Sequence, residues 1–365
     1  MKTDLDLARR LADRTEELVG IASESGSEAA ILDRIDRTVG ALPRHGDAAH
    51  DGVRLYAHEP HPDRPFVVLA GHVDTVPVAG SASPGRRGEA IVGRGSADMK
   101  AGLAVMLELA ADLGSGQRAD RPADVGYCFF GREELPITQS ALLPFLRATP
   151  LVERIDLAVV LEPTGNALEV GCLGNLNADV IFRGISAHSA RPWNGENAAH
   201  AAIHGLREIA SATPRDVEQD GLIYREVVNV TAISGGRARN VLPDEVRASV
   251  NFRYAPDRTA EEAELQLRRW IVSAGAEIDV IGNAPAGPVP EGNPLVASLR
   301  AAGDLDRRAK QAWTSVAEFG LMAVDAVNFG PGDPAMAHTD GELVEIPDIV
   351  RSYDVLHRFL TGAAR

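Results

Sequence analysis

The sequence predicts an α/β protein with a mixed, largely parallel sheet, interrupted by a small α+β segment. Three observations carry this prediction. Continuous apolar runs alternate with helical patterns in the first part of the chain, a central stretch alternates polar and apolar residues, and a Pro/Gly-rich stretch follows it at 283–290, before one more apolar run. We therefore expect one domain built from residues 1–174 and 286–365, with residues 175–285 inserted into it.

The outer domain begins with two predicted helices, at 5–21 and 27–42, in which apolar residues recur at helical spacing. A third helix is predicted at 101–113. Continuous apolar runs predict buried strands at 65–71, 125–130, 156–161 and 326–330. Strands that are apolar on both faces and are separated by helices indicate a sheet that is largely parallel.

The inserted segment has a different pattern. Its predicted elements follow the order β-α-β-β-α-β, which is typical of a small open-faced sandwich. In chain order they lie at 177–183, 196–211, 227–234, 246–252, 259–273 and 277–281.

Composition limits the kind of partner. Among 365 residues, 37 are Lys or Arg and 52 are Asp or Glu, so the formal net charge is -15. This acidic balance argues against nucleic acid or an anionic membrane as partner. The only cysteines are Cys128 and Cys172, which excludes a disulfide framework. No signal-like or membrane-spanning apolar run is visible, so we expect a cytoplasmic protein.

Ionisable residues collect where the predicted strands end. The carboxyl ends of strands in an open α/β sheet are where ligands bind. Together with an acid that precedes the helix at 101–113, these residues are His72, Asp74, Glu133, Glu134, Glu162, His338 and Asp98. Two imidazoles and several carboxylates form the ligand mix that suits Zn²⁺ or a similar ion.

Two local spacings refine this prediction. His72 and Asp74 point to the same side of an extended segment, so Asp74 can orient the His72 ring. Glu133 and Glu134 are adjacent and point in different directions, so one can bind a metal while the other faces the reacting water.

The motifs GHVDTVP, GRGSADMKAG, GREE, LEPT and AHTDGE resemble those of the M20 metallopeptidase family, and the resemblance covers nearly the whole chain. Longer stretches, such as GISAHSARPWNGENAAH and NFRYAPDR, are most similar to the actinobacterial succinyl-diaminopimelate desuccinylases within that family. The resemblance implies a zinc-peptidase-like catalytic domain and an insert that serves as a lid and dimerisation domain. We therefore expect a homodimer.

The resemblance also implies a centre of two Zn²⁺ ions, for which Co²⁺ or Mn²⁺ could substitute. His72 and Glu162 would hold one ion, Glu134 and His338 would hold the other, and Asp98 would bridge both.

Further roles follow from the same resemblance. Glu133 would be the general base, and the peptide between Asp98 and Met99 is expected to be cis. His188 would reach the active site of the partner subunit and stabilise the oxyanion there. The residues expected to contact substrate are Asn240, Arg253, Thr314 and Ser315.

The substrate implied by the resemblance is a small N-acyl amino acid. N-succinyl-LL-diaminopimelate, an intermediate of lysine and diaminopimelate biosynthesis, is the first choice. The alternatives are a deacylase for another N-acyl amino acid such as acetylornithine, a dipeptidase, and a catalytically silent binding protein on the same scaffold. Glu318 bears on this choice, because we expect an arginine facing a substrate carboxylate near this position in the desuccinylases. A glutamate there would repel a carboxylate.

Overall fold

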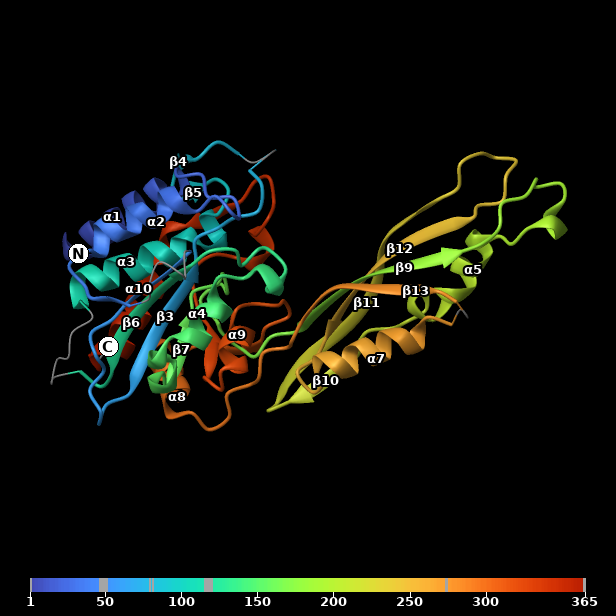
Figure 1. The fold of residues 1–365 in the computed structure, drawn as a ribbon. Helices are drawn as coiled ribbons and strands as arrows, with labels where there is room; N and C mark the ends of the chain where they lie inside the picture. The colour runs from blue at the N-terminus through green and yellow to red at the C-terminus, as the bar shows by residue number, and fades with distance from the viewer. Residues whose placement is uncertain are drawn as a thin grey trace. The chain divides into compact units, whose positions relative to one another are not determined.

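The computed structural model describes residues 2–45, 52–78, 80, 82–114, 121–272 and 275–363. The chain divides into two compact units (Figure 1). The larger unit comprises Met1–Gly171, Pro288–Arg308 and Thr314–Arg365, and the inserted unit comprises Cys172–Gly287 and Ala309–Trp313. The predicted fold class, an α/β sheet interrupted by an α+β segment, is confirmed.

An eight-stranded sheet forms the centre of the larger unit, in the order β1-β2-β6-β3-β7-β15-β8-β14. Its strands are β1 (Arg44–His45), β2 (Val53–Tyr56), β3 (Phe66–His72), β6 (Asp124–Phe130), β7 (Leu157–Val160), β8 (Leu168–Val170), β14 (Arg307–Ala309) and β15 (Ala326–Asn328). The strands β6, β3, β7 and β15 run parallel, whereas β2 and β8 pair antiparallel at their flanks. A small second sheet contains β16 (Leu343–Glu345), β5 (Ala90–Val92) and β4 (Gly85–Arg87).

Helices cover both faces of the large sheet (Figure 1). They are α1 (Lys2–Val19), α2 (Ala29–Val39), α3 (Ala101–Leu113), α4 (Leu142–Ala148), α8 (Pro294–Gly303), α9 (Val316–Leu321) and α10 (Ile346–Thr361). A Cβ at Gly71 would meet Leu103 and Met106 of α3, so this side of β3 faces α3. His72, the next residue, therefore faces the opposite side of the sheet, because side chains alternate along a strand.

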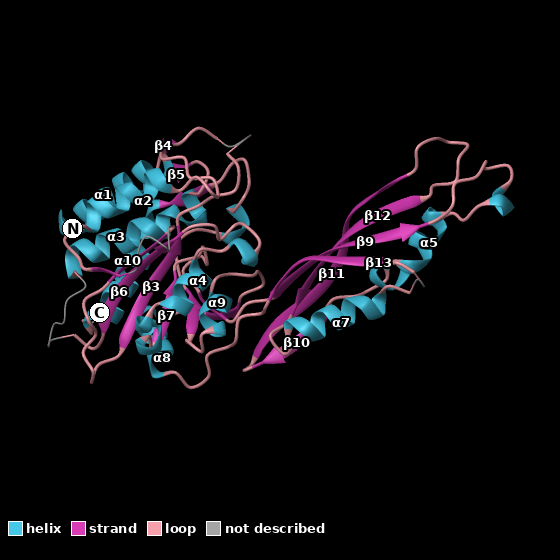
Figure 2. Cartoon of the chain, in the orientation of Figure 1, coloured by secondary structure: helices cyan, strands magenta, loops and turns pink. Residues whose placement is uncertain are grey.

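The inserted unit contains a five-stranded antiparallel sheet in the order β10-β11-β12-β9-β13. Its elements are β9 (Gly174–Arg183), α5 (Ala198–Gly205), α6 (Arg207–Ala210), β10 (Arg215–Gln219), β11 (Leu222–Gly235), β12 (Glu245–Tyr254), α7 (Ala260–Trp270) and β13 (Glu277–Ala284). Alternate residues of β9 and β12, such as Val180 and Phe252, pack with residues of α5 and α7 into one core. Figure 2 shows these two helices beside the strands of this sheet. The opposite face of this sheet is polar, with residues such as Asn177 and Asn251.

Three features of the insert differ from the prediction. The single helix predicted at 196–211 is two helices, α5 and α6, which meet next to Gly205, a residue with low helix propensity. The strand β10 was not predicted, because its residues RDVEQ are mostly polar. The helix predicted at 259–273 ends at Trp270, and Ser273 lies outside the described residues.

Candidate metal centre

Most of the predicted ligands lie at one edge of the eight-stranded sheet. His72 is the last residue of β3, and Glu162 follows shortly after the end of β7. Glu133 and Glu134 follow the end of β6. Because β3 pairs in parallel with both β6 and β7, the carboxyl ends of the three strands bring these side chains to one place.

Asp98 approaches this edge from the turn that precedes α3, and the peptide between Asp98 and Met99 is cis, as predicted. Gly102 in the first turn of α3 permits the approach. A Cβ at this position would lie 2.4 Å from the carbonyl oxygen of Leu161, which is closer than a carbon and an oxygen can pack. The missing side chain thus lets α3 begin directly against the end of β7, next to Glu162.

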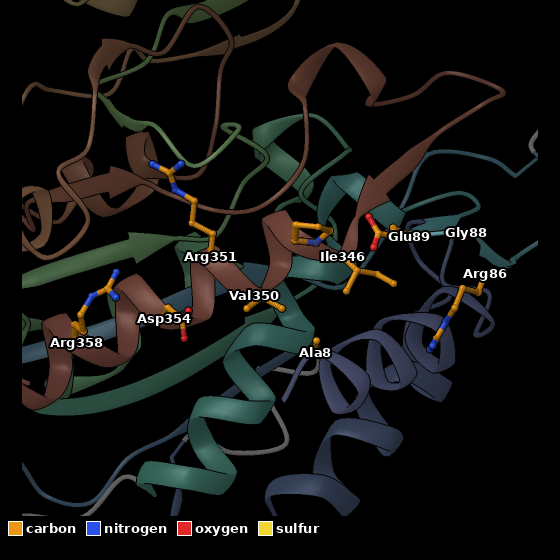
Figure 3. Close-up of a pocket in the computed structure, with 10 residues that line it drawn as sticks. Ala8, Arg86, Gly88, Glu89, Ile346, Val350, Arg351, Asp354 and Arg358 are labelled. Atoms are coloured by element: carbon orange, nitrogen blue, oxygen red, sulfur yellow. The ribbon is translucent and has the colours of Figure 1, made fainter. Parts of the chain in front are cut away.

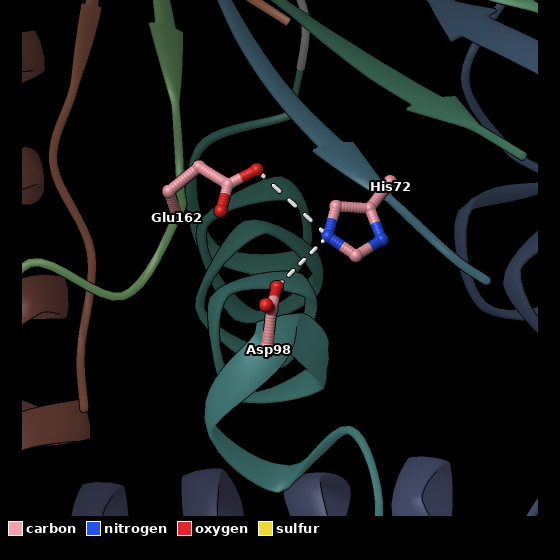
Figure 4. A group of neighbouring side chains, drawn as sticks. All are labelled: His72, Asp98 and Glu162. Carbon is pink, nitrogen blue, oxygen red and sulfur yellow. Dashed lines mark hydrogen bonds and ion pairs between the residues drawn. The ribbon is translucent and has the colours of Figure 1, made fainter. Parts of the chain in front are cut away.

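The first cluster surrounds the Nε2 atom of His72. This nitrogen lies 3.0 Å from Oδ1 of Asp98 and 3.8 Å from Oε1 of Glu162. Figure 4 shows both carboxylates pointing at this same ring nitrogen. The His72 side chain is only 1% exposed, so the imidazole ring is buried.

The second cluster surrounds the Nε2 atom of His338, in the loop after β15. This nitrogen lies 2.9 Å from Oε1 of Glu134 and 3.3 Å from Oδ2 of Asp98. Asp98 therefore presents one oxygen to each histidine. Glu133 is close as well, because it shares a third grouping of ligand atoms with His72 and Glu134.

These side chains fit a metal centre. In each grouping the ligand atoms of three residues lie within 4.8 Å of one another. Imidazole nitrogen combined with carboxylate oxygen is a donor set that Zn²⁺ and similar divalent ions accept. A carboxylate that faces both clusters with different oxygens is suited to bridge two ions.

The spacing of His72 and Asp74 in the sequence suggested that the Asp74 side chain orients the His72 ring, but the Asp74 carboxylate makes its hydrogen bonds elsewhere. The Nδ1 atom of His72 lies 3.0 Å from the backbone carbonyl oxygen of Asp74 and 3.7 Å from its carboxylate. That carboxylate accepts hydrogen bonds from the backbone N–H groups of Glu133 and Glu134, at 3.1 and 3.2 Å, and from the hydroxyl of Ser25 at 2.7 Å. Asp74 thus contacts the His72 ring through its backbone and the two glutamates through its side chain.

The electrostatics of the site favour a cation. Hydrogen bonds to Asp98 and Glu134 raise the pKa of His338 to about 10. Burial by itself lowers the pKa of His72, but the hydrogen bond to Asp98 and the surrounding carboxylates outweigh burial, so that the pKa is raised. Burial raises the pKa of Glu133 well above its usual value. Such shifts are expected where carboxylates outnumber cations, and a divalent ion would relieve the excess negative charge.

Thr314, Ser315 and Glu318 lie at or just before the start of α9 and are buried. The Ser140 hydroxyl donates a hydrogen bond of 2.5 Å to Oε1 of Glu318. Glu318 has no exposed surface, and its burial raises the pKa of its carboxyl group. Glu318 is therefore enclosed inside the larger unit.

The remaining predicted residues belong to the inserted unit. His188 and Asn240 lie on two exposed loops that contact each other, since the Ser189 N–H donates to the Asn240 carbonyl at 2.9 Å. Arg253 is not near them. The loop with His188 follows the end of β9, and the loop with Asn240 precedes Glu245, the first residue of β12. Arg253 lies eight residues further along β12, which is about 26 Å in an extended strand.

Sequence reasoning missed Arg94 and Glu342. Glu342 accepts hydrogen bonds from the turn that carries Asp98, and Arg94 is paired with Glu342 and donates to the carbonyl oxygen of Thr339, next to His338. Neither residue belongs to a periodic pattern. Arg94 stands in a glycine-rich stretch whose motif points to Asp98, and Glu342 lies in a loop whose motif points to His338, so neither motif singles them out.

A separate groove of about 430 Å³ lies along α10, beside α1 and the β4–β5 turn. Figure 3 shows Arg86 and Arg358 at opposite ends of it. The Arg86 guanidinium is paired with Asp13 at 2.7 Å, and the Nε atom of Arg358 donates to the Ala302 carbonyl. The charged groups therefore do not converge on one point, in contrast to those at the strand ends.

Comparison with known families identifies the class of protein. A model of peptidase family M20/M25/M40 matches residues 68–362. The chain therefore belongs to this family, and it is an M20-family hydrolase.

Two relatives are similar over almost their whole length. A Mycobacterium tuberculosis protein named succinyl-diaminopimelate desuccinylase DapE is 36% identical over 359 residues, which cover 98% of this chain and 100% of the relative. A succinyl-diaminopimelate desuccinylase of Corynebacterium glutamicum is 34% identical over 376 residues, with 99% of each chain covered.

Solved structures of low sequence identity share the fold. A tripeptidase from Staphylococcus aureus matches with a TM-score of 0.77 at 18% identity, and the match covers 97% of this chain and 98% of the other. The YXEP protein of Bacillus subtilis, described as a dinuclear metal-binding peptidase of the M20 family, matches with a TM-score of 0.70 at 14% identity and 98% coverage of each chain. Within the described residues, no helix has the length and apolar character needed to span a bilayer.

Proposed function

We propose that this chain is a metal-dependent amide hydrolase that cleaves N-succinyl-LL-diaminopimelate into succinate and LL-diaminopimelate. The main support for metal-dependent chemistry is that Asp98 directs different oxygens at His72 and His338. The substrate assignment is supported by the two relatives named desuccinylases, which are 34% and 36% identical over nearly the full chain.

The proposed centre holds two Zn²⁺ ions, which Co²⁺ or Mn²⁺ could replace. His72 and Glu162 would bind one ion, Glu134 and His338 would bind the other, and Asp98 would bridge them. The distances within the two clusters support this division, because Asp98 is the residue that both clusters share. When bound, the ions would supply Lewis acidity, which makes water more acidic and polarises the amide carbonyl.

Glu133 is the proposed general base. It would accept a proton from the attacking water and deliver that proton to the amine nitrogen as the C–N bond breaks. The oxygen of the water would end in the carboxylate of succinate, and the amine would leave as LL-diaminopimelate. The position of Glu133 supports this role, because it shares a grouping of ligand atoms with His72 and Glu134, and a general base must lie within reach of the water that it activates. Asp74 would hold the Glu133 backbone through the hydrogen bond of 3.1 Å.

The substrate assignment is tested directly by comparing the hydrolysis of several N-acyl amino acids and dipeptides. Zinc-loaded protein would be assayed for release of free amine from N-succinyl-LL-diaminopimelate, N-acetylornithine, other N-acyl amino acids and dipeptides. We expect the succinylated diaminopimelate to give the highest kcat/KM. Turnover of another compound, with the succinyl compound ignored, would contradict the substrate assignment and leave the metal-dependent chemistry standing.

A second candidate function is a deacylase for a different N-acyl amino acid. One observation favours it. Position 318, near which the resemblance implies an arginine facing a substrate carboxylate, carries a fully buried glutamate that is bound to Ser140. A glutamate at this position supplies no positive charge for a succinyl carboxylate.

We also propose a homodimer formed through the inserted unit. From Val227 to Gly235 one edge of β11 has no partner strand in the described part of the chain, and this stretch contains no charged residue or proline. Exposed strand edges without such protection are suited to pair with another chain. Ile233 and Trp193 are 61% and 76% exposed on the same unit, and they support an interface there. His188 of each subunit would then complete the active site of the partner. The residues proposed to contact the substrate are Asn240, Arg253, Thr314 and Ser315.

A further inference from the structure

Arg94 and Glu342 form an ion pair inside the larger unit that the proposed reaction does not use. The Nη1 atom of Arg94 lies 2.9 Å from Oε2 of Glu342. Their side chains are 7% and 1% exposed. A buried pair of this kind gives little net stability compared with apolar residues of the same volume, so stability alone does not account for it.

The second oxygen of Glu342 holds the turn that carries Asp98. Its Oε1 atom accepts hydrogen bonds from the backbone N–H groups of Ala97 and Asp98, at 3.1 and 3.0 Å. Both bonds involve a charged acceptor, which makes them stronger than bonds between neutral groups. Glu342 thereby holds the backbone from which the Asp98 carboxylate projects.

Arg94 connects this turn to two further loops. Its Nη1 atom also donates to the carbonyl oxygen of Thr339, at 3.1 Å, directly after His338. Its Nε atom donates to the carbonyl oxygen of Pro77, at 3.3 Å, in the loop that follows Asp74. One buried pair therefore contacts three segments that each carry a residue of the metal centre.

We propose that the Arg94–Glu342 pair positions the metal ligands: it presets the distance between Asp98 and His338 so that both clusters can bind an ion at once. The inference rests on the proposed function, since it assigns a role within the same metal centre. Neither residue touches the reacting atoms, so both are positioning residues. The geometry of a centre with two ions tolerates little displacement of a bridging ligand, and loss of supporting contacts typically lowers metal affinity about 10- to 100-fold.

The principal variant is Glu342→Gln. It retains an oxygen that can accept from Ala97 and Asp98 but removes the negative charge that faces Arg94. The matched control is Glu108→Gln, because Glu108 is another carboxylate of the larger unit that is 2% exposed and ion-paired; its partners are two arginines of α1, Arg10 at 2.5 Å and Arg14 at 3.1 Å. These pairs join α1 to α3 and do not contact the loops of the metal centre. A second variant, Arg94→Lys, keeps the charge with fewer donors and serves if Glu342→Gln does not fold.

Zinc affinity and stoichiometry would be measured by competition with a chelator, together with Tm and the visible spectrum of the cobalt-substituted protein. We expect Glu342→Gln and Arg94→Lys to weaken zinc binding by about tenfold or more and to change the cobalt spectrum. We expect Glu108→Gln to lower Tm while its zinc affinity stays within about twofold of the wild type.

Two outcomes would overturn the inference, and they can be told apart. In the first, Glu342→Gln and Arg94→Lys bind zinc as the wild type does, or lose no more affinity than Glu108→Gln. The Arg94–Glu342 pair would then be merely structural, and the proposed function would be unaffected. If the wild-type chain itself bound no zinc, the proposed function would fail and this inference with it.

Discussion

At the scale of single residues, Asp98 defines the site because its two oxygens face different histidines. The neighbouring carboxylates differ in their surroundings, in keeping with the different roles proposed for them. Glu134 is hydrogen-bonded to His338 at 2.9 Å, whereas burial raises the pKa of Glu133. The first is suited to be a ligand and the second a proton carrier.

The role of Glu133 is tested by Glu133→Gln, which removes the proton acceptor and keeps the size of the side chain. We expect kcat to fall about 10²- to 10⁴-fold while two zinc ions remain bound, because general-base catalysis contributes factors of this size. Steady-state kinetics and metal analysis of the same sample provide the measurement. Wild-type turnover with a full complement of zinc would remove Glu133 from the mechanism.

The buried carboxyl group of Glu318 should make the stability of the fold depend on pH. Its burial raises the folded-state pKa above the usual 4.5, so the folded protein binds a proton that the unfolded chain has already lost. The wild type should therefore lose stability as pH rises from about 4.5 toward the raised pKa, by about 1.4 kcal/mol per pH unit in that window. Glu318→Gln keeps an acceptor for Ser140 and has no proton to lose.

Urea unfolding of both proteins between pH 5 and 8 measures this effect. The difference in the free energy of unfolding, Glu318→Gln minus wild type, should become more positive as pH rises toward the raised pKa of Glu318 and should then level off. Two curves that stay parallel over this range would show that Glu318 ionises normally in the folded state.

At the scale of elements, the site depends on strand ends that meet at one edge and on the start of α3. Gly102 makes the second feature possible. We expect Gly102→Ala to destabilise the fold by about 1–3 kcal/mol, because the added methyl group would overlap the Leu161 carbonyl oxygen. The same change should shift Asp98 and weaken zinc binding. Normal stability together with normal zinc affinity in this variant would contradict the packing described for α3.

The length of each element determined how much of the fold and of the site could be predicted from the sequence. The positions of His72 and Glu162 were predictable because long apolar runs identify β3 and β7, and parallel strands bring their ends together. Short strands such as β8 and β14, with three residues each, have no periodicity that a sequence pattern can reveal. Arg94 and Glu342 were missed for a related reason: their contacts join loops that are 248 residues apart.

At the scale of the whole molecule, the proposed dimer makes a prediction that no monomer could satisfy. His188→Ala and Glu133→Gln homodimers should each be nearly inactive. If His188 acts in the site of the partner, subunit exchange should create heterodimers in which one site has both residues intact. Mixing the two proteins should then restore up to about one quarter of wild-type activity, since half of the dimers would be mixed and each would have one complete site.

Light scattering of the separate variants is the control for dimer formation. A mixture of dimers that exchanges subunits but stays inactive would place His188 outside the partner's site. A monomeric wild-type protein with full activity would exclude the dimer as a requirement for catalysis.

The metal centre is the claim on which every other proposal depends, and anomalous diffraction from zinc-loaded crystals tests it most directly. We expect two peaks, one beside His72 and Glu162 and the other beside Glu134 and His338, with Asp98 in contact with both. A single peak, or peaks away from these residues, would contradict the proposed centre.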